Sequence, residues 1–229
     1  MKSIVFDTGP IISLTMNNLL WILEPLKKMG NANFYITDSV KKELVDTPLN
    51  KTKRYKFEAL QVLNHIDNGT LEVIENSEIK KQTSKFLDIA NNCFRAFGHN
   101  MNLVHYAEMS AIALYIQKKA DAFVVDERTT RQLIENPVKL LNILRHKLHT
   151  KVEDNKSSLS EFRKITQNVS IIRSVELVTV AYEKGLLDRY IANIPDSKKT
   201  LIESILWGVK LNGCAVSKRE IEQIMRIES

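Results

Sequence analysis

Short apolar runs alternate with longer segments of helical spacing along most of the chain. Five runs rich in β-branched and aromatic residues are too short for helices and are bounded by turn or capping residues. They predict strands at residues 4–6, 33–36, 71–74, 122–125 and 168–172. Because a helical segment follows each strand, the pattern predicts an α/β fold with a parallel sheet and right-handed crossovers.

Two of the predicted strands end at an aspartate. Asp7 follows the first strand, and Gly9-Pro10 then leads into a helical segment; Asp126 follows the fourth strand. Taken alone, Asp7 is better explained as the cap of the next helix. Ligands of open parallel sheets, however, bind beyond the carboxyl ends of the strands, where the strand order reverses. Two strands that both end at an aspartate therefore favour a shared site.

The second half of the chain is less regular. Residues 151–160 are polar and predict a mobile connector between helices. The last stretch, 197–229, predicts two helices: Gly213 ends the first, and Ser217 and Glu220 form a capping box for the second.

Composition restricts the function classes only a little. The 229 residues are 44% hydrophobic and 26% charged, as in ordinary globular proteins, and the formal net charge of +6 permits a polyanionic partner without requiring one. The two cysteines are far apart, which argues against a zinc site or a disulfide framework. No apolar run is long enough for a membrane span and no leader precedes the first strand, so we expect a soluble cytoplasmic protein without a membrane partner.

Four segments together resemble the PIN domain family of the archaeal and bacterial type. They are Val5–Leu14, Thr37–Leu44, Ala107–Leu114 and Val124–Arg128. The resemblance implies a three-layer α/β/α fold with a central parallel sheet of about five strands, and the activity of a metal-dependent nuclease of single strands. The family's acidic quartet carries over onto Asp7, Glu43, Glu108 and Asp126. The third acid is often aspartate in relatives, and here it is Glu108.

The resemblance also divides the chain. It covers residues 1–131 and extends over 169–185, so we expect a PIN-like nuclease domain over 1–190. Compact members pass from the fourth acid to the fifth strand in a few residues, so a helical insertion is expected at about 136–167. A C-terminal helical extension is expected over 191–229.

The four acids suit a hard divalent cation. Carboxylates that converge on one crevice raise one another's pKa values unless a cation neutralises them. With oxygen ligands and no cysteine pair nearby, Mg²⁺ or Mn²⁺ is the expected cofactor. Asp7, Glu108 and Asp126 are the expected ligands, and Glu43 is a ligand or a base that positions water. Three hydroxyl side chains are candidates to support these ligands, although capping and turn bonding explain them equally well: Thr8, Ser13 and Thr129.

Basic residues near the acids are candidates for binding nucleic acid. They form a cluster in one linker and a pair beside the fourth acid: Lys51, Lys53, Arg54 and Lys56, with Arg128 and Arg131. A solvated helix face explains the cluster equally well. Tyr55 lies within the cluster and either stacks on a base or belongs to the core.

We therefore predict a metal-dependent endoribonuclease that hydrolyses single-stranded RNA and leaves a 3′-hydroxyl and a 5′-phosphate. The alternative is a non-catalytic PIN-like module that binds RNA or a protein. Homodimers are common among such domains, so we expect a homodimer; an antitoxin or another protein partner is also considered. The sequence Asp7-Thr8-Gly9 occurs once and is followed by a helix, which argues against an aspartic protease, and no P-loop is present.

Overall fold

The protein, described by a computed structural model over residues 1–228, is organised around a parallel sheet of five strands. The strand order is β3-β2-β1-β6-β8. The strands are β1 (Lys2–Phe6), β2 (Ala32–Thr37), β3 (Leu71–Ile74), β6 (Ala122–Val124) and β8 (Ile171–Ile172). The predicted α/β class and the five predicted strands are confirmed, with small shifts at the strand ends.

Helices cover both faces of this sheet and enclose two hydrophobic cores. On one face, Phe6, Phe34 and Val124 contact a first group of helices. This group is α1 (Thr8–Met16), α2 (Leu23–Met29), α5 (Lys56–Asp67), α11 (Ser174–Glu183), α12 (Ser197–Leu211) and α13 (Lys218–Glu228). On the other face, Val5 and Phe123 contact a second group. It comprises α6 (Ser77–Asn91), α7 (Tyr106–Lys118), α8 (Arg128–Glu135), α9 (Pro137–Leu148) and α10 (Lys156–Thr166). The result is the expected three-layer α/β/α arrangement.

Two short 3₁₀ helices lie at Leu20–Ile22 and Asp188–Tyr190. The connection after β2 consists of α3 (Asp38–Lys41), a π-helical turn at Lys42–Asp46 and α4 (Thr47–Lys51). The middle of this connection is therefore a π turn and not a regular α-helix. Such turns occur often at functional sites.

A second, antiparallel sheet was not expected from the sequence. It has the order β5-β4-β7 and consists of β4 (Phe94–Ala96), β5 (His99–Asn100) and β7 (Val152–Asp154). The prediction of a mobile connector at 151–160 is wrong, because β7 and the first half of α10 occupy it. Val152 is fully buried and pairs with Ala96, so this segment is held by contacts that are distant in sequence.

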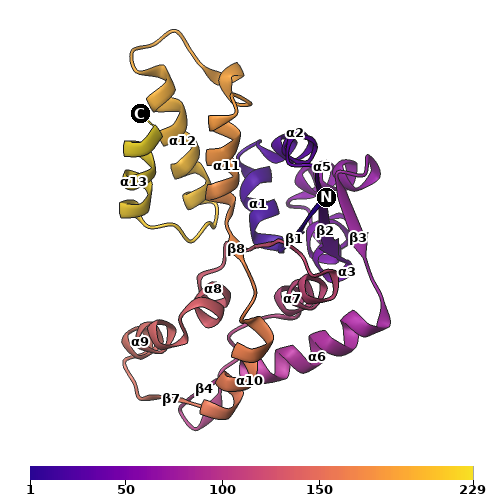
Figure 1. Cartoon of the computed structure of the whole chain (residues 1–229), viewed down its shortest axis with the longest axis vertical. Coiled ribbons are helices and arrows are strands. Elements are labelled where there is room, and N and C mark those ends of the chain that lie inside the picture. Colours follow the sequence, from indigo (N-terminus) through magenta and orange to yellow (C-terminus); the bar gives the residue numbers. More distant parts are fainter. Residues whose placement is uncertain (229) are drawn as a thin grey trace.

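The two C-terminal helices form as predicted and join the core of the α1 face. Ser217 and Glu220 make the expected capping box at the start of α13. Ile202 and Leu206 of α12 and Ile221 of α13 belong to the same hydrophobic cluster as Phe6. In Figure 1, α11, α12 and α13 stand together at the upper left, whereas α6 and α10 lie at the bottom with β4 and β7. None of the helices within residues 1–228 has the length and apolar character needed to cross a membrane.

Candidate active site

The strand order reverses between β1 and β6, and both strands lead into acidic residues. In the register of the sheet Phe6 lies opposite Val124, and the amide of Asp7 donates to the carbonyl of Val124 at 3.0 Å. Asp7 occupies the N-cap position of α1, where its side chain makes no capping hydrogen bond, and Asp126 lies two residues beyond the end of β6. The topology therefore places both aspartates at the switch point, where open α/β sheets bind their ligands.

Asp7 has a buried carboxylate with unused hydrogen-bonding capacity. The residue is 3% exposed, and its Oδ1 atom is buried with no hydrogen-bond partner among the described residues. Burial first, and then the negative charges of Glu108 and Glu43, raise the pKa of Asp7 to about 8 against the opposing effect of the Thr8 and Gly9 amides. A buried carboxylate beside other negative charges is stabilised when it binds either a proton or a cation.

Glu108 supplies the second buried acid, from the first turn of α7. It is 8% exposed, and its Oε2 atom accepts a hydrogen bond of 2.8 Å from the amide of His105, which orients the side chain. Burial, followed by the charges of Glu127 and Glu43, raises the pKa of Glu108 to about 7, while the His105 amide and the Thr130 hydroxyl oppose the rise. Two neighbouring acids therefore both resist ionisation near neutral pH.

Glu43 stands on the π turn and completes this group at the solvent-facing side. The residue is exposed, and its Oε2 atom accepts a hydrogen bond of 2.7 Å from the hydroxyl of Thr8, the residue after Asp7. Its charge raises the pKa of both Asp7 and Glu108. Three of the four predicted acids are thus electrostatically coupled, and Thr8, one of the hydroxyl candidates, donates a hydrogen bond to one of them.

Asp126 is surrounded differently. Only 1% of it is exposed; Oδ2 accepts from the hydroxyls of Ser13 at 2.6 Å and Ser174 at 2.7 Å, and Oδ1 accepts from the Ser174 amide at 2.8 Å. Both carboxylate oxygens therefore have partners within the protein. Ser13 was a sequence candidate, whereas nothing local in the sequence links Ser174 to Asp126.

Glu127, the next residue, is the acid of this segment whose charge affects the pKa of Glu108. Its side chain caps α8 by accepting from the amide of Thr130 at 2.7 Å, and its charge raises the pKa of Glu108. The residue itself is exposed. The hydroxyl near Glu108 belongs to Thr130, whereas Thr129 was the candidate from sequence; Thr130 Oγ1 is buried without a hydrogen-bond partner among the described residues.

The basic candidates divide into two kinds. The cluster between α4 and α5 is fully at the surface: Lys51, Lys53, Arg54 and Lys56 are exposed. Arg128 is also exposed, at the start of α8. Arg131 is largely covered, since its guanidinium faces Glu135 at 3.6 Å and donates to the carbonyl of Ala215 at 3.4 Å. The cluster and Arg128 are therefore the cations that are free to meet an incoming polyanion.

The carboxylate oxygens of these acids are suitable ligands for a hard divalent cation, although they do not converge on one point in this structure. Within residues 1–228, no three side chains of the types His, Cys, Asp and Glu converge closely enough to hold a metal ion. The acids nevertheless offer oxygen donors only, and Asp7 leaves one buried oxygen without a partner. Asp7, Glu43 and Glu108 are the residues that would hold such an ion.

A family model described as a PIN domain matches residues 3–137, which is more than half of the chain. The chain belongs to the PIN domain family. PIN domains are generally nucleases and typically use divalent metal ions. No curated protein and no solved structure matches the chain significantly. The matched region includes all the acids described above and ends at the start of α9.

Proposed function

We propose that this PIN domain is a divalent-metal-dependent endoribonuclease that hydrolyses single-stranded RNA and leaves a 3′-hydroxyl and a 5′-phosphate. The buried carboxylate of Asp7, unpartnered at Oδ1 and coupled to Glu108 and Glu43, is the observation that carries the proposal. A purely structural acid in such a place would be hydrogen-bonded, as Asp126 is. Retention of an uncompensated buried acid is typical of functional sites.

Asp7, Glu108 and Glu43 would hold Mg²⁺ or Mn²⁺ in this proposal. We favour Glu127 as a fourth metal ligand over the predicted Asp126. The charge of Glu127 raises the pKa of Glu108, whereas the carboxylate of Asp126 already accepts hydrogen bonds from Ser13 and Ser174. The bound ion supplies Lewis acidity to the scissile phosphate and acidity to an attacking water.

The protein groups have their own parts in the proposed reaction. The His105 amide fixes the Glu108 side chain, and the Thr8 hydroxyl fixes Glu43. Because Glu43 is exposed, its second oxygen is accessible to orient a water molecule toward the phosphate. The exposed cluster Lys51, Lys53, Arg54 and Lys56 would contact the RNA backbone without regard to sequence.

Several predictions from sequence lie beyond these observations. The non-catalytic module stays the alternative function. A homodimer, an antitoxin or other protein partner, and a cytoplasmic location stay predictions. The division into a domain over 1–190 with an insertion at about 136–167 and an extension over 191–229 is also kept as a proposal, with the qualification that α12 and α13 share the core of the α1 face.

Opening of a circular single-stranded RNA tests the proposal, because only an endonuclease acts on a circle. We expect opening with Mn²⁺, none with EDTA, and a loss of at least about a hundredfold in Asp7→Asn. The exposed Asp67, at the end of α5, gives the matched control Asp67→Asn, which should cut like the wild type. Cutting by Asp7→Asn at the wild-type rate would overturn the proposal. Binding of the RNA without cutting under any condition would replace it with the non-catalytic module.

A further inference from the structure

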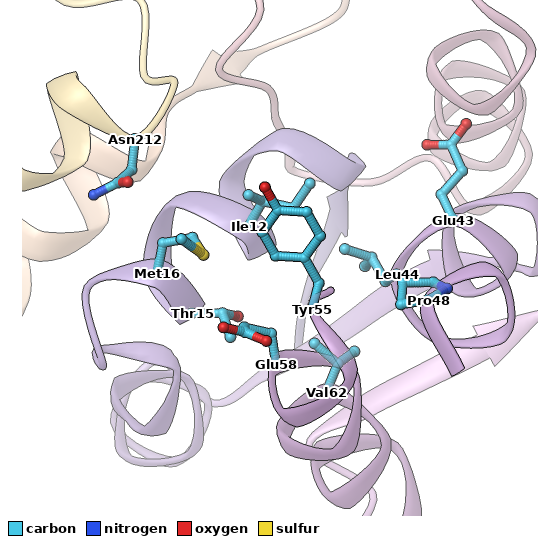
Figure 2. A pocket seen from close by; sticks show the side chains of 10 residues that line it. All are labelled: Ile12, Thr15, Met16, Glu43, Leu44, Pro48, Tyr55, Glu58, Val62 and Asn212. Atoms are coloured by element: carbon cyan, nitrogen blue, oxygen red, sulfur yellow. The ribbon is translucent and has the colours of Figure 1, made fainter. Parts of the chain in front are cut away.

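We propose that the cavity beside Glu43 is a nucleobase subsite, in which an unpaired base of the RNA stacks on Tyr55. This inference rests on the proposed function. The cavity has a volume of about 380 Å³ and lies between α1, the π turn with α4, and α5. Its apolar walls are formed by Ile12, Met16, Leu44, Pro48, Tyr55 and Val62. Figure 2 shows the ring of Tyr55 in the middle of this lining, with Glu43 and Asn212 on opposite sides of the view.

Glu43 belongs both to the cavity and to the acidic site. It lines the cavity, and its carboxylate accepts the hydrogen bond from Thr8, which follows Asp7 in the chain. A nucleotide with its base in the cavity would therefore hold its sugar and phosphate next to the acids. The cavity is in the right place to select which phosphate is presented for hydrolysis.

The chemistry of the cavity suits a base better than a phosphate. Besides the apolar walls, the lining includes two acidic residues, Glu43 and Glu58, and no basic residue, so it would not attract an anion. Carboxylates accept hydrogen bonds from the amino groups of bases, as acidic side chains do from cytosine. Glu58 therefore favours a base that presents an amino group, while the apolar walls accept any base face.

Tyr55 is presented to the cavity by a local backbone feature. It has a left-handed backbone with φ 63° at the start of α5, a conformation that is uncommon for an aromatic residue, and the residue is 54% exposed. Of the two interpretations of Tyr55 from sequence, the core is therefore wrong. An exposed aromatic ring over an apolar hollow is the usual platform for an unpaired base.

Charge around the cavity supports the same occupant. Lys53, Arg54 and Lys56 flank Tyr55 in the chain and are exposed, so the segment that carries the ring is basic, whereas the lining of the hollow is acidic. This arrangement matches a single strand that keeps its phosphates outside and places a base inside.

The test measures binding without cleavage, by the fluorescence anisotropy of a labelled single-stranded RNA in EDTA. We expect Tyr55→Ala to weaken binding about tenfold and Tyr55→Phe to stay within about twofold of the wild type. Met16→Trp, which fills the cavity from α1, should also weaken binding. Phe57 is 70% exposed and lines a different hollow with Trp21 and Leu60, so Phe57→Ala is the matched control and should bind normally.

An abasic ribose-phosphate oligomer of the same length separates stacking from charge. Tyr55→Ala should bind this oligomer as the wild type does. The subsite is wrong if Tyr55→Ala binds RNA normally, or if it loses RNA and the abasic oligomer equally. Opening of circular RNA by the wild type reports separately on the nuclease: cutting with normal RNA binding by Tyr55→Ala overturns the subsite alone, whereas a wild type that neither binds nor cuts RNA overturns both proposals.

Discussion

The hydroxyl of Ser13 donates a hydrogen bond of 2.6 Å to Oδ2 of Asp126, across 113 positions of sequence. The same hydroxyl lies 3.2 Å from the carbonyl of Asn212, the residue after α12. Ser13 thus connects α1, the end of β6 and the C-terminal helices at one buried point. Asp126 is the acid that holds these elements together, whereas Asp7 has a carboxylate oxygen without a hydrogen-bond partner among the described residues.

The main effect of Ser13→Ala should therefore be a loss of folding stability and not a loss of catalytic rate. The change removes a buried hydrogen bond to a charged group, which is worth about 1.5–3 kcal/mol, and the melting temperature should fall by several degrees. Calorimetry measures the loss, and Ser204→Ala, at an exposed position of α12, is the control. An unchanged melting temperature in Ser13→Ala would contradict the structural role of Asp126.

Arg173 makes the corresponding link to α13. Its guanidinium is mostly buried; it donates to Glu220 at 2.8 Å and to the carbonyl of Ala215 at 3.1 Å, and it also pairs with Glu176. Both glutamates are more than a third exposed, so solvent weakens each ion pair. We expect Arg173→Met to cost about 1–3 kcal/mol and to increase proteolysis in the segment 212–217.

Arg219 is exposed on α13 and supplies the control for this change. Arg219→Met should leave both the melting temperature and the rate of proteolysis unchanged. Equal behaviour of the two variants would mean that Arg173 does not hold α13 in place.

The metal-free protein should lose stability as the pH rises toward 8. The pKa of Asp7 is about 8 in the folded protein, against an ordinary value of 3.8, so the folded state binds more protons between these limits. Its contribution to stability is complete below about pH 4 and is lost as the pH rises through about 8. Glu108, whose pKa is raised from 4.5 to about 7, acts in the same direction.

Melting temperatures in EDTA between about pH 5 and pH 8.5 check this dependence. The wild type should fall by several degrees, and Asp7→Asn should fall less and be the more stable protein at the upper end. Asp67→Asn should follow the wild type. A wild-type melting temperature that rises over this range, or an equal slope in Asp7→Asn, would show that folding does not raise the pKa of Asp7.

The sheet and its acids could be predicted because their signals are local. Asp7 ends a short apolar strand and precedes Gly9-Pro10, and this pattern alone places it at the carboxyl end of β1. The parallel order then brings Asp126 to the same edge. The capping box at Ser217 and Glu220 is another local signal, and it forms as expected.

The remaining features depend on partners that are distant in sequence. The different surroundings of Asp126 and Glu127 depend in part on Ser174, which lies 48 positions beyond Asp126. Whether Thr129 or Thr130 faces Glu108 depends on the rotation of α8, which a weakly apolar sequence does not determine. The strands β4, β5 and β7 have two or three residues each, too few to show a period, so their pairing could not be predicted.

Mn²⁺ binding to the purified protein, followed by the electron paramagnetic resonance signal of the free ion, tests the site most directly. Because Asp7 and Glu108 must lose protons to bind the ion, the affinity of the wild type should increase between about pH 6 and pH 8. Asp7→Asn and Glu108→Gln should each bind at least about tenfold more weakly, and Asp67→Asn should match the wild type. Equal Mn²⁺ affinity in the wild type and Asp7→Asn would contradict a metal site built on Asp7, Glu43 and Glu108.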